Sequence, residues 1–331
     1  MKKVLLTLFV TMCLHFAKAQ QSYLHCGRLI DGASGEVQTE MTIVVEENRI
    51  DRIVSGYARV PDGVTAVDLK NKTVMPGLID MHVHIEGESS PKRYEENFRL
   101  NDADVALRAT TYAKKTLMAG FTTVRDLGGS GVNVSLRNAI NKGYVDGPRI
   151  YTCEKAIGTT GGHADPTNGV RKDLMGDPGP KEGVVNGVED ARKAVRQRYK
   201  NGADVIKITS TGGVLSVAKD GQGPQFTMEE LGAIVAIAND YGMVTAAHAH
   251  GAEGMKRAVM AGINTIEHGT FMTEEIMDLM VEKGTYYVPT ISAGKFVVEA
   301  AKRPGFFPPM VARKAMEVGP QIQETFAKAY R

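Results

Sequence analysis

Two histidines at the end of a mostly apolar run offer metal-binding chemistry. His82 and His84 follow the run at residues 74–81 and are separated by one residue. If the run is a β-strand, residues two apart point to the same face, so both imidazoles lie side by side at its carboxyl end. Neutral imidazole is the commonest metal ligand in proteins. The pair therefore predicts a metal site, with two stacked surface histidines as the alternative interpretation.

Further chemistry-bearing side chains lie near the ends of later apolar runs. Of the eight histidines, His248, His250 and His268 occur there, and Lys207 lies within the run at residues 205–209. In a barrel of alternating strands and helices, the carboxyl ends of all strands meet at one mouth. Histidines placed at random would rarely converge in this way, so we predict one metal centre. For His250, a satisfied core histidine is the alternative.

The elements that must position these residues alternate between strand and helix. Strands are expected at residues 74–81, 123–126, 149–153, 205–209, 244–248, 264–268 and 286–289. Helices are expected at residues 104–119, 132–142, 188–200, 228–241, 252–261, 274–283 and 311–330. Glycine closes most of these helices, where a left-handed cap is favoured. The pattern predicts an α/β fold, namely a (β/α)8 TIM-type barrel whose last strand is missing from this chain.

Residues 1–19 have the features of a signal peptide. Lys2 and Lys3 are basic, residues 4–13 are apolar, and Ala-Lys-Ala at residues 17–19 fits a cleavage site. A membrane anchor needs about 20 apolar residues, which is longer than this run. We therefore expect an exported protein, periplasmic or secreted, with no membrane segment after signal cleavage.

The mature chain is expected to contain two domains. Residues 20–75 hold short β-branched runs separated by turn residues, which predict a small N-terminal β-sandwich unit. Residues 76–331 form the barrel domain with strands one to seven and the helix that follows them. Cys26 and Cys153 belong to no CxxC pair, and a disulfide bond between them is left open.

The overall composition excludes several classes of partner. The 331 residues are 43% hydrophobic and 24% charged, with a net charge of +2. Such a balanced charge does not predict binding to nucleic acid or to an acidic membrane surface. The expected partner is a small-molecule or short-peptide substrate, and assembly into a homo-oligomer is left open.

Lys207 has two interpretations. An ammonium beside metal ions in a barrel mouth is unfavourable, so Asp204 or Asp126 could be its ion-pair partner. Alternatively, the neutral amine captures carbon dioxide to form a carbamate, a carboxylate-like group able to bridge two divalent metals. Asp126 could instead pair with Arg125 or with a backbone amide.

The sequence resembles the amidohydrolase superfamily. The motifs that carry the resemblance are Pro76-Gly-Leu-Ile-Asp-Met-His-Val-His84, Val205-Ile-Lys-Ile208, Ala246-Ala-His-Ala-His-Gly251 and Glu267-His-Gly269. His248 follows Lys207 by 41 residues and precedes His268 by 20. These intervals are similar to those of the binuclear-metal branch that includes carboxypeptidases, Xaa-Pro dipeptidase (prolidase-like) and imidazolonepropionase-like enzymes. The likeness extends from about Leu29 to the end of the chain.

This resemblance implies a role for each predicted ligand. His82, His84 and an aspartate of strand eight would hold one metal, while His248 and His268 would hold a second. Carboxylated Lys207 would bridge the two divalent ions, for which zinc suits the ligand types. A hydroxide bridging the metals would attack a carbonyl carbon, and the aspartate would pass its proton to the leaving amine.

Two histidines are candidates for contacts with the substrate. His163 lies in the glycine-rich loop at residues 158–165, from which it could reach a substrate carboxylate or oxyanion. A histidine of a surface loop is the alternative interpretation. His250 faces the same way as His248 and could also contact the substrate.

The sequence departs from the family near its C-terminal end. No aspartate follows Asp278, which lies in an expected helix, so the general-base aspartate is absent from the chain. We expect a C-terminally truncated fragment that is itself inactive, since Asp126 or Asp165 would otherwise have to carry the proton. A natural seven-strand variant is the alternative, but it would leave two strand edges open.

Three functions remain in competition. The first is metal-dependent hydrolysis of carbon–nitrogen bonds, in dipeptides or at short peptide C-termini. The second is hydrolysis of a cyclic amide, as in imidazolonepropionase-like enzymes, although export argues against substrates that arise inside the cell. The third is a non-catalytic protein that binds a metal or another ligand, and the missing aspartate is its only support.

Overall fold

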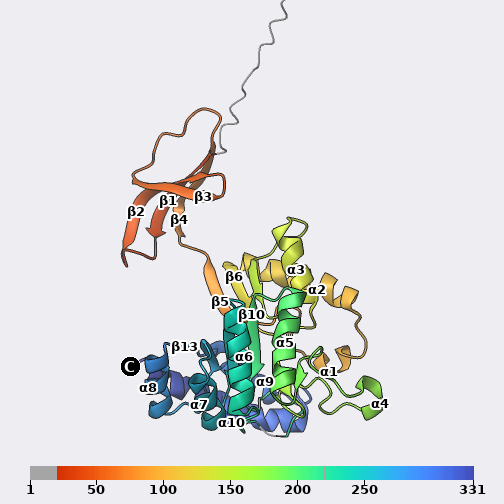
Figure 1. Cartoon of the computed structure of the whole chain (residues 1–331). Coiled ribbons are helices and arrows are strands. Elements are labelled where there is room, and N and C mark those ends of the chain that lie inside the picture. The colour runs from red at the N-terminus through yellow and green to blue at the C-terminus, as the bar shows by residue number, and fades with distance from the viewer. Residues whose placement is uncertain (1–20, 220) are drawn as a thin grey trace, which may run out of the picture. The chain divides into compact units, whose positions relative to one another are not determined.

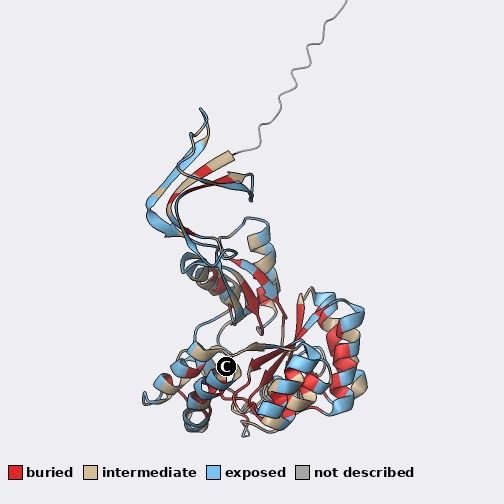
Figure 2. Cartoon of the chain, turned by 90° about the vertical axis from the view of Figure 1, so that its left-hand side faces the viewer, coloured by how far each residue is buried: buried red, intermediate tan, exposed pale blue. Residues whose placement is uncertain are grey.

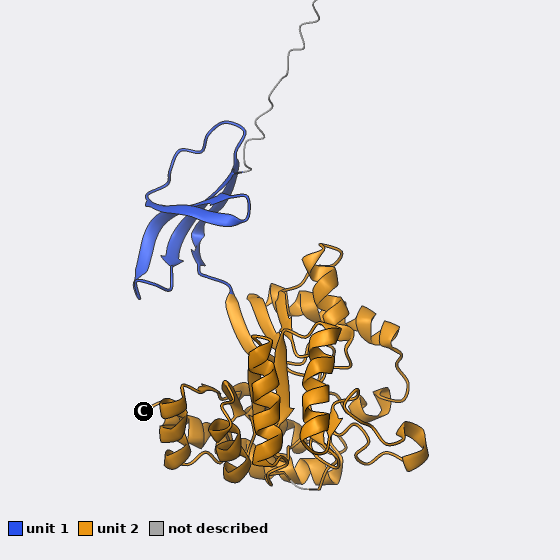
Figure 3. Cartoon of the chain, in the orientation of Figure 1, with its two compact units in different colours: residues 1–77 blue, residues 78–331 orange. Residues whose placement is uncertain are grey.

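The computed structural model describes residues 21–219 and 221–331, which belong to two compact units (Figure 3). Unit 1 is Met1–Gly77 and unit 2 is Leu78–Arg331, a division close to the predicted domain boundary. The signal peptide predicted at residues 1–19 lies outside the described residues and stays a prediction.

Unit 1 forms a single β-sheet in its described part. Its strands are β1 (Gln21–Ile30), β2 (Val37–Glu46), β3 (Arg49–Ser55) and β4 (Thr65–Val74). They lie in the order β3-β2-β1-β4, with β1 antiparallel to β2 and parallel to β4. One face buries a small core that includes Cys26, Leu29 and Met41. The predicted sandwich of two packed sheets is not confirmed, because the described strands pair in one sheet.

Unit 2 contains the seven parallel strands that the sequence predicts. They are β5 (Leu78–Val83), β6 (Phe121–Asp126), β7 (Arg149–Thr152), β10 (Val205–Thr209), β11 (Val244–Ala249), β12 (Thr265–His268) and β13 (Tyr286–Val288). They pair in the orders β5-β6-β7 and β10-β11-β12-β13. Backbone hydrogen bonds from Asp204 N to Thr152 O (2.7 Å) and from Ile157 N to Lys207 O (2.8 Å) connect these two sheets. The short strands β8 (Gly158–Thr159) and β9 (Val184–Val185) pair separately.

Helices follow the strands of unit 2 in alternation (Figure 1). The long ones are α2 (Asp102–Met118), α3 (Val132–Asn141), α5 (Val188–Asn201), α6 (Met228–Asp240), α7 (Ala252–Met260), α8 (Glu274–Lys283), α9 (Ile291–Ala301) and α10 (Pro309–Ala329). Two single turns, α1 (Arg93–Glu96) and α4 (Lys172–Met175), lie in loops. The sequence prediction missed α9, which packs closely against α10. A side chain at Gly319 of α10 would lie only 2.9 Å from the carbonyl oxygen of Gly294 in α9.

The main hydrophobic core of unit 2 lies between its second sheet and the helices α5 to α8. Buried residues of this core include Ile206 and Ile208 from β10, Ile234 from α6, Val259 from α7 and Ile266 from β12. Figure 2 shows buried residues along these strands and on the helix faces that cover them. Because apolar side chains anchor the strands from outside, the other strand face is available for polar chemistry.

The two outer strands of unit 2 do not pair with each other in the described part of the chain. β5 pairs only with β6, and β13 pairs only with β12. Ile79 on β5 and Tyr286 on β13 are 62% and 74% exposed. Unit 2 therefore has the α/β architecture and parallel sheets of the predicted barrel, but a closed eight-stranded barrel is not observed. The eighth strand and its aspartate stay predictions.

Two further expectations concern membranes and thiols. Among the described residues, no helix combines the length and the apolarity needed to cross a membrane. Cys26 and Cys153 are both free and buried, so no disulfide bond joins them in this structure.

Candidate metal centre

The structure brings the imidazoles predicted as metal ligands into one continuous cluster. His82 is the last residue but one of β5 and His84 follows the strand, with 5.4 Å between their ring centres. The ring of His268, at the end of β12, lies 4.9 Å from that of His82 and 4.7 Å from that of His248 on β11. Strand ends that are far apart in sequence therefore meet at one place, and the role of these side chains as ligands stays a prediction.

The two histidines predicted to contact the substrate lie in the same cluster. The ring centre of His250 is 4.6 Å from that of His248 and 5.0 Å from that of His268. The ring of His163 lies 4.3 Å from that of His248. His163 is therefore not an isolated surface-loop histidine, because its loop folds its ring against the cluster.

Three of the imidazoles are held through Nδ1, and their Nε2 atoms have no hydrogen-bonding partner among residues 21–219 and 221–331. His84 Nδ1 donates to the carbonyl oxygen of Gly128 over 2.8 Å, so its Nε2 carries the lone pair. His82 Nδ1 lies 2.9 Å from a carboxylate oxygen of Glu267. His268 Nδ1 lies 2.7 Å from the hydroxyl of Thr290. Metal-ligating histidines are usually oriented by such a hydrogen bond from the nitrogen that does not bind the metal.

His248 is held through the opposite nitrogen. Its Nε2 donates to the carbonyl oxygen of Gly212 over 3.1 Å, so Nδ1 carries the lone pair. His250 Nδ1 lies 2.7 Å from the hydroxyl of Thr270, which itself comes from the loop after β12. Each of these five rings, those of His82, His84, His248, His250 and His268, thus uses one nitrogen for a hydrogen bond within the protein. Imidazole nitrogens of this kind are suitable ligands for a divalent ion.

Lys207 lies beside this cluster and has little hydrogen bonding. The residue is 3% exposed, and its Nζ lies 3.4 Å from the carbonyl oxygen of Leu127. Burial lowers the pKa of the Lys207 amine, although Glu267 opposes that effect. Among the described residues, Lys207 forms no ion pair with Asp204 or Asp126, although the charge of Asp126 opposes part of the lowering of the Lys207 pKa, so the alternative interpretation of a direct ion pair is not observed.

Burial also keeps the imidazoles neutral. It lowers the pKa of His250, which is only 3% exposed, to about 3, and the charge of Lys314 adds to the effect. Burial lowers the pKa of His82, His248 and His268 well below the ordinary value. His84 is the more exposed member at the rim, and desolvation together with the charge of Lys207 lowers its pKa to about 4. Neutral imidazole is the form that binds metals.

Arg125 and Asp126 do not pair with each other, which corrects one sequence interpretation. Arg125 instead donates from Nη2 to Glu267 Oε1 over 2.6 Å. Asp126 accepts hydrogen bonds from Asn133 Nδ2 (2.6 Å), Thr152 Oγ1 (2.8 Å) and, as predicted for a backbone amide, Ile85 N (3.1 Å). Through these hydrogen bonds, Asp126 holds the ends of β5 and β7 together.

The loop that carries His163 is organised by Asp165. Its carboxylate accepts from Gly161 N over 2.7 Å and from Thr167 N over 2.8 Å. His163 N donates to Gln225 Oε1 over 2.9 Å, and the imidazole Nδ1 is buried with no hydrogen-bonding partner in the part of the chain that the structure describes. The buried Nδ1 of His163 can therefore form a hydrogen bond with a ligand. The carboxylate of Asp165, in contrast, already accepts hydrogen bonds from the backbone of its own loop.

Glu267, which contacts His82, was not identified from the sequence, and neither were the residues that hold Glu267 in place. Thr265 Oγ1 donates to Glu267 Oε1 over 2.5 Å, and this oxygen also accepts from Arg125. Burial raises the pKa of the Glu267 carboxyl, and Arg125 and Lys207 oppose that rise. Only the position of Glu267 beside His268 in a quoted motif could have drawn attention to it.

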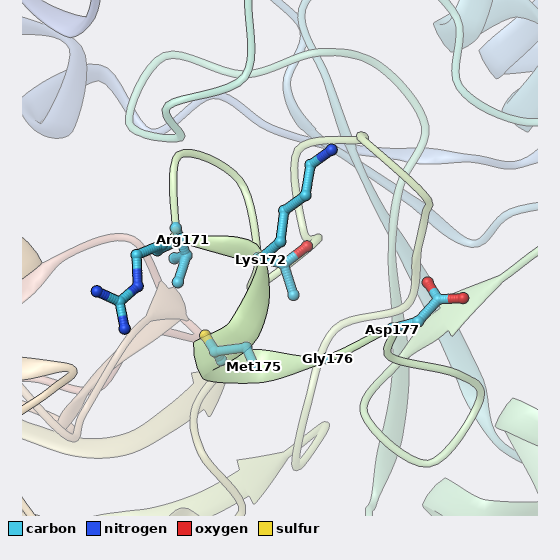
Figure 4. Close-up of a pocket in the computed structure, with 7 residues that line it drawn as sticks. Arg171, Lys172, Met175, Gly176 and Asp177 are labelled. Carbon is cyan, nitrogen blue, oxygen red and sulfur yellow. The ribbon is translucent and has the colours of Figure 1, made fainter.

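The side chains of the cluster do not enclose an ion in this geometry. Among residues 21–219 and 221–331, no three His, Cys, Asp or Glu side chains stand close enough together to enclose a metal. A surface cavity of about 380 Å³ lies elsewhere, around α4 (Figure 4). Its residues Arg171 and Lys172 point in different directions, and Arg171 pairs with Asp173 over 2.6 Å. We therefore place the candidate site at the histidine cluster, where the donor types fit.

The chain is similar to several known proteins. The Amidohydrolase family matches residues 73–323. A Xaa-Pro dipeptidase solved with methionine in its active site is 56% identical, with a TM-score of 0.90 over 94% of this chain and 76% of that chain. A prolidase in complex with N-methylphosphonate-L-proline is 34% identical, with a TM-score of 0.83 over 93% of this chain and 76% of that chain.

The chain is also similar to a longer curated protein. Ochratoxinase from Aspergillus niger is 32% identical over 290 residues, which are 83% of this chain and 60% of that protein. The chain therefore spans less than two thirds of the length of the curated relatives that it matches first.

The neutral state of His250 predicts that acid destabilises the metal-free protein. Because its pKa is about 3 when folded and 6.5 otherwise, the unfolded chain binds more protons between these values. The free energy of unfolding should then fall as pH falls, by about 2 kcal/mol from this residue alone between about pH 6.5 and about pH 5. Urea titrations with a chelator present measure this slope.

The variant His250→Gln should have a shallower slope in the same titrations, because glutamine does not titrate. Lys256→Gln, at an exposed lysine outside the cluster, is the control and should retain the slope between these pH values. An unchanged slope in His250→Gln would contradict a buried neutral imidazole at this position.

Proposed function

The chain belongs to the amidohydrolase family, and from this premise we propose that the whole protein is a metal-dependent hydrolase of carbon–nitrogen bonds. The proposed substrates are dipeptides or short peptide C-termini. The observation that carries the proposal is the meeting of neutral imidazoles and Lys207 at the strand ends. The likeness to a Xaa-Pro dipeptidase supports the substrate class.

The proposed cofactors are two divalent ions, with zinc as the first choice for imidazole and carboxylate ligands. His82 and His84 would hold one ion through Nε2, because both use Nδ1 for the protein. His248, through Nδ1, and His268 would hold the other. Lys207 in carboxylated form would bridge them. When bound, such ions polarise a carbonyl and provide a strong nucleophile from water at neutral pH.

The protein's own side chains would orient the substrate. The buried Nδ1 of His163 has no partner and lies beside His248, where it can hydrogen-bond a substrate carboxylate or an oxygen that develops negative charge. His250 is held by Thr270 and can present its other nitrogen to the substrate. The carboxylates of Asp126 and Asp165 both accept hydrogen bonds from their own surroundings.

Export to the periplasm or the medium is part of the proposal. It rests on residues 1–19 alone and agrees with a substrate class of short peptides that are present outside the cell.

Replacing Lys207 by alanine tests the proposed bridge. The whole protein should lose metal, and its turnover should fall by more than about 100-fold, because even residues behind a ligand can contribute up to that factor. Metal analysis and peptide hydrolysis measure the two effects, and a short carboxylic acid should restore part of each. The exposed Lys256→Ala is the control. Unchanged metal content in Lys207→Ala would overturn the carbamate assignment.

Separate alanine variants test which histidine of β11 is the ligand. His248→Ala should lose metal, because its free Nδ1 is the proposed ligand atom. His250→Ala should keep its metal and mainly raise KM or lower kcat. Metal content and steady-state kinetics of both variants decide the matter, and the reverse result would show that the assigned roles are exchanged.

A substrate panel tests the proposed activity itself. The zinc-loaded whole protein should hydrolyse dipeptides, including those with C-terminal proline, and leave a cyclic amide such as an imidazolone intact. Amino-acid release measured by chromatography provides the readout. Cleavage of the cyclic amide alone would favour the imidazolonepropionase-like alternative. Metal binding without cleavage of any member would instead favour a non-catalytic binding protein.

A further inference from the structure

A buried network of polar side chains contacts His82 and connects three strands. Arg125 of β6 is 4% exposed and Glu267 of β12 is fully buried. Arg125 donates from Nε to the carbonyl oxygen of Met81 in β5 over 2.8 Å and from Nη1 to Thr265 Oγ1 over 3.1 Å. Its Nη2 donates to Glu267 Oε1 over 2.6 Å. One planar guanidinium therefore ties β5, β6 and β12 together inside unit 2.

The two carboxylate oxygens of Glu267 have different partners. Oε1 accepts from both Arg125 and Thr265, whereas Oε2 faces His82 Nδ1 at 2.9 Å. A carboxylate can only accept hydrogen bonds, so His82 must donate from Nδ1. The lone pair of His82 is then on Nε2, the nitrogen that has no protein partner.

The anchor of His82 differs from those of its neighbours. His84 is held by a backbone carbonyl and His268 by a hydroxyl, which are both neutral groups. Only His82, among these three, is held by a charged group within a buried ion pair. A buried ion pair is weak as a source of stability, because desolvation offsets the attraction between the charges. The pair is therefore better explained by the orientation and the tautomer that it imposes on His82.

We propose that Glu267 is a positioning residue for metal binding, held in place by Arg125 and Thr265, and that it fixes His82 as an Nε2 ligand. The inference rests on the proposed function only in taking His82 as a ligand. It predicts that the network controls the affinity of the ion held by His82 and His84. The ion held by His248 and His268 depends on other anchors, Gly212 and Thr290.

Zinc titration of the whole protein in competition with a chromophoric chelator tests this proposal. Glu267→Gln should weaken one of the two zinc sites by about 10- to 100-fold and leave the other unchanged, since outer partners of ligands have effects of that size. Glu154→Gln is the matched control, because Glu154 also forms a buried pair, with Arg198 at 3.1 Å, and has no histidine partner. The control should keep both affinities.

Two further variants keep the test decisive. Arg125→Lys retains the charge but lacks the planar fork, so it should weaken the same zinc site by a smaller factor. In the background of His82→Ala, Glu267→Gln should have no further effect on zinc affinity, because its partner is gone. Equal weakening of both sites, the same loss in Glu154→Gln, or an additive effect with His82→Ala would overturn the proposal.

A readout without metal separates positioning from general structural support. In the chelator-treated protein, imidazole ¹⁵N chemical shifts should show His82 protonated at Nδ1, and Glu267→Gln should yield a mixture of tautomers. The same tautomer in both proteins would contradict the proposal. Selective weakening of one zinc site in a protein that cleaves no peptide would overturn the proposed function and leave this inference standing.

Discussion

Successive residues of a β-strand point to opposite faces, and the candidate site depends on this alternation. On β6, Arg125 points to the polar interior and bonds to Glu267, whereas Asp126 bonds to Asn133 of α3 on the helix side. On β12, Thr265 and Glu267 face the interior, and Ile266 between them belongs to the hydrophobic core. On β12 the interior face therefore carries the polar groups and the opposite face supplies apolar packing, whereas both faces of β6 carry polar groups with buried partners.

His268 joins the cluster because its backbone departs from this pattern. In a regular strand it would point away from the face that Glu267 uses. Its φ of 72° lies in the left-handed region, which a residue with a side chain rarely adopts. Thr290, its hydrogen-bonding partner, also has a positive φ, of 50°. Two unusual conformations at one contact are typical of functional sites, where surrounding structure maintains local strain.

Much of this architecture could be predicted from the sequence. The seven strands could be predicted from apolar runs and from the glycines that end helices. The clustering of the histidines followed from the rule that the carboxyl ends of barrel strands meet at one mouth. The resemblance to the amidohydrolase superfamily is confirmed. Helix α9 was missed because Gly294 and the β-branched residues Val297 and Val298 weaken its intrinsic helical preference. It is stabilised instead by packing on α10, which local sequence patterns do not report.

The partners of the site residues were harder to predict, because they are neighbours only in space. The expected pair of Arg125 with Asp126 does not form, because adjacent residues of a strand point to opposite faces. Arg125 pairs instead with Glu267, which is 142 residues away in the sequence. A lysine in a polar mouth suggested an aspartate partner, but the nearest recorded acceptor of Lys207 is a carbonyl oxygen of Leu127. Spacing identifies which side chains reach the mouth, whereas hydrogen bonding there depends on side-chain directions.

The interior network also explains how the first sheet of unit 2 keeps its position beside the second. The β5-β6-β7 and β10-β13 sheets share few backbone hydrogen bonds, and β5 does not pair with β13 in the described residues. Arg125 and His82 of the first sheet both bond to Glu267 of the second, so one carboxylate bridges the interior. A small shift between the sheets that broke these bonds without admitting water would leave a buried charge unpaired, which is strongly unfavourable. The contact that orients His82 thereby also fixes the distance between the two halves of the cluster.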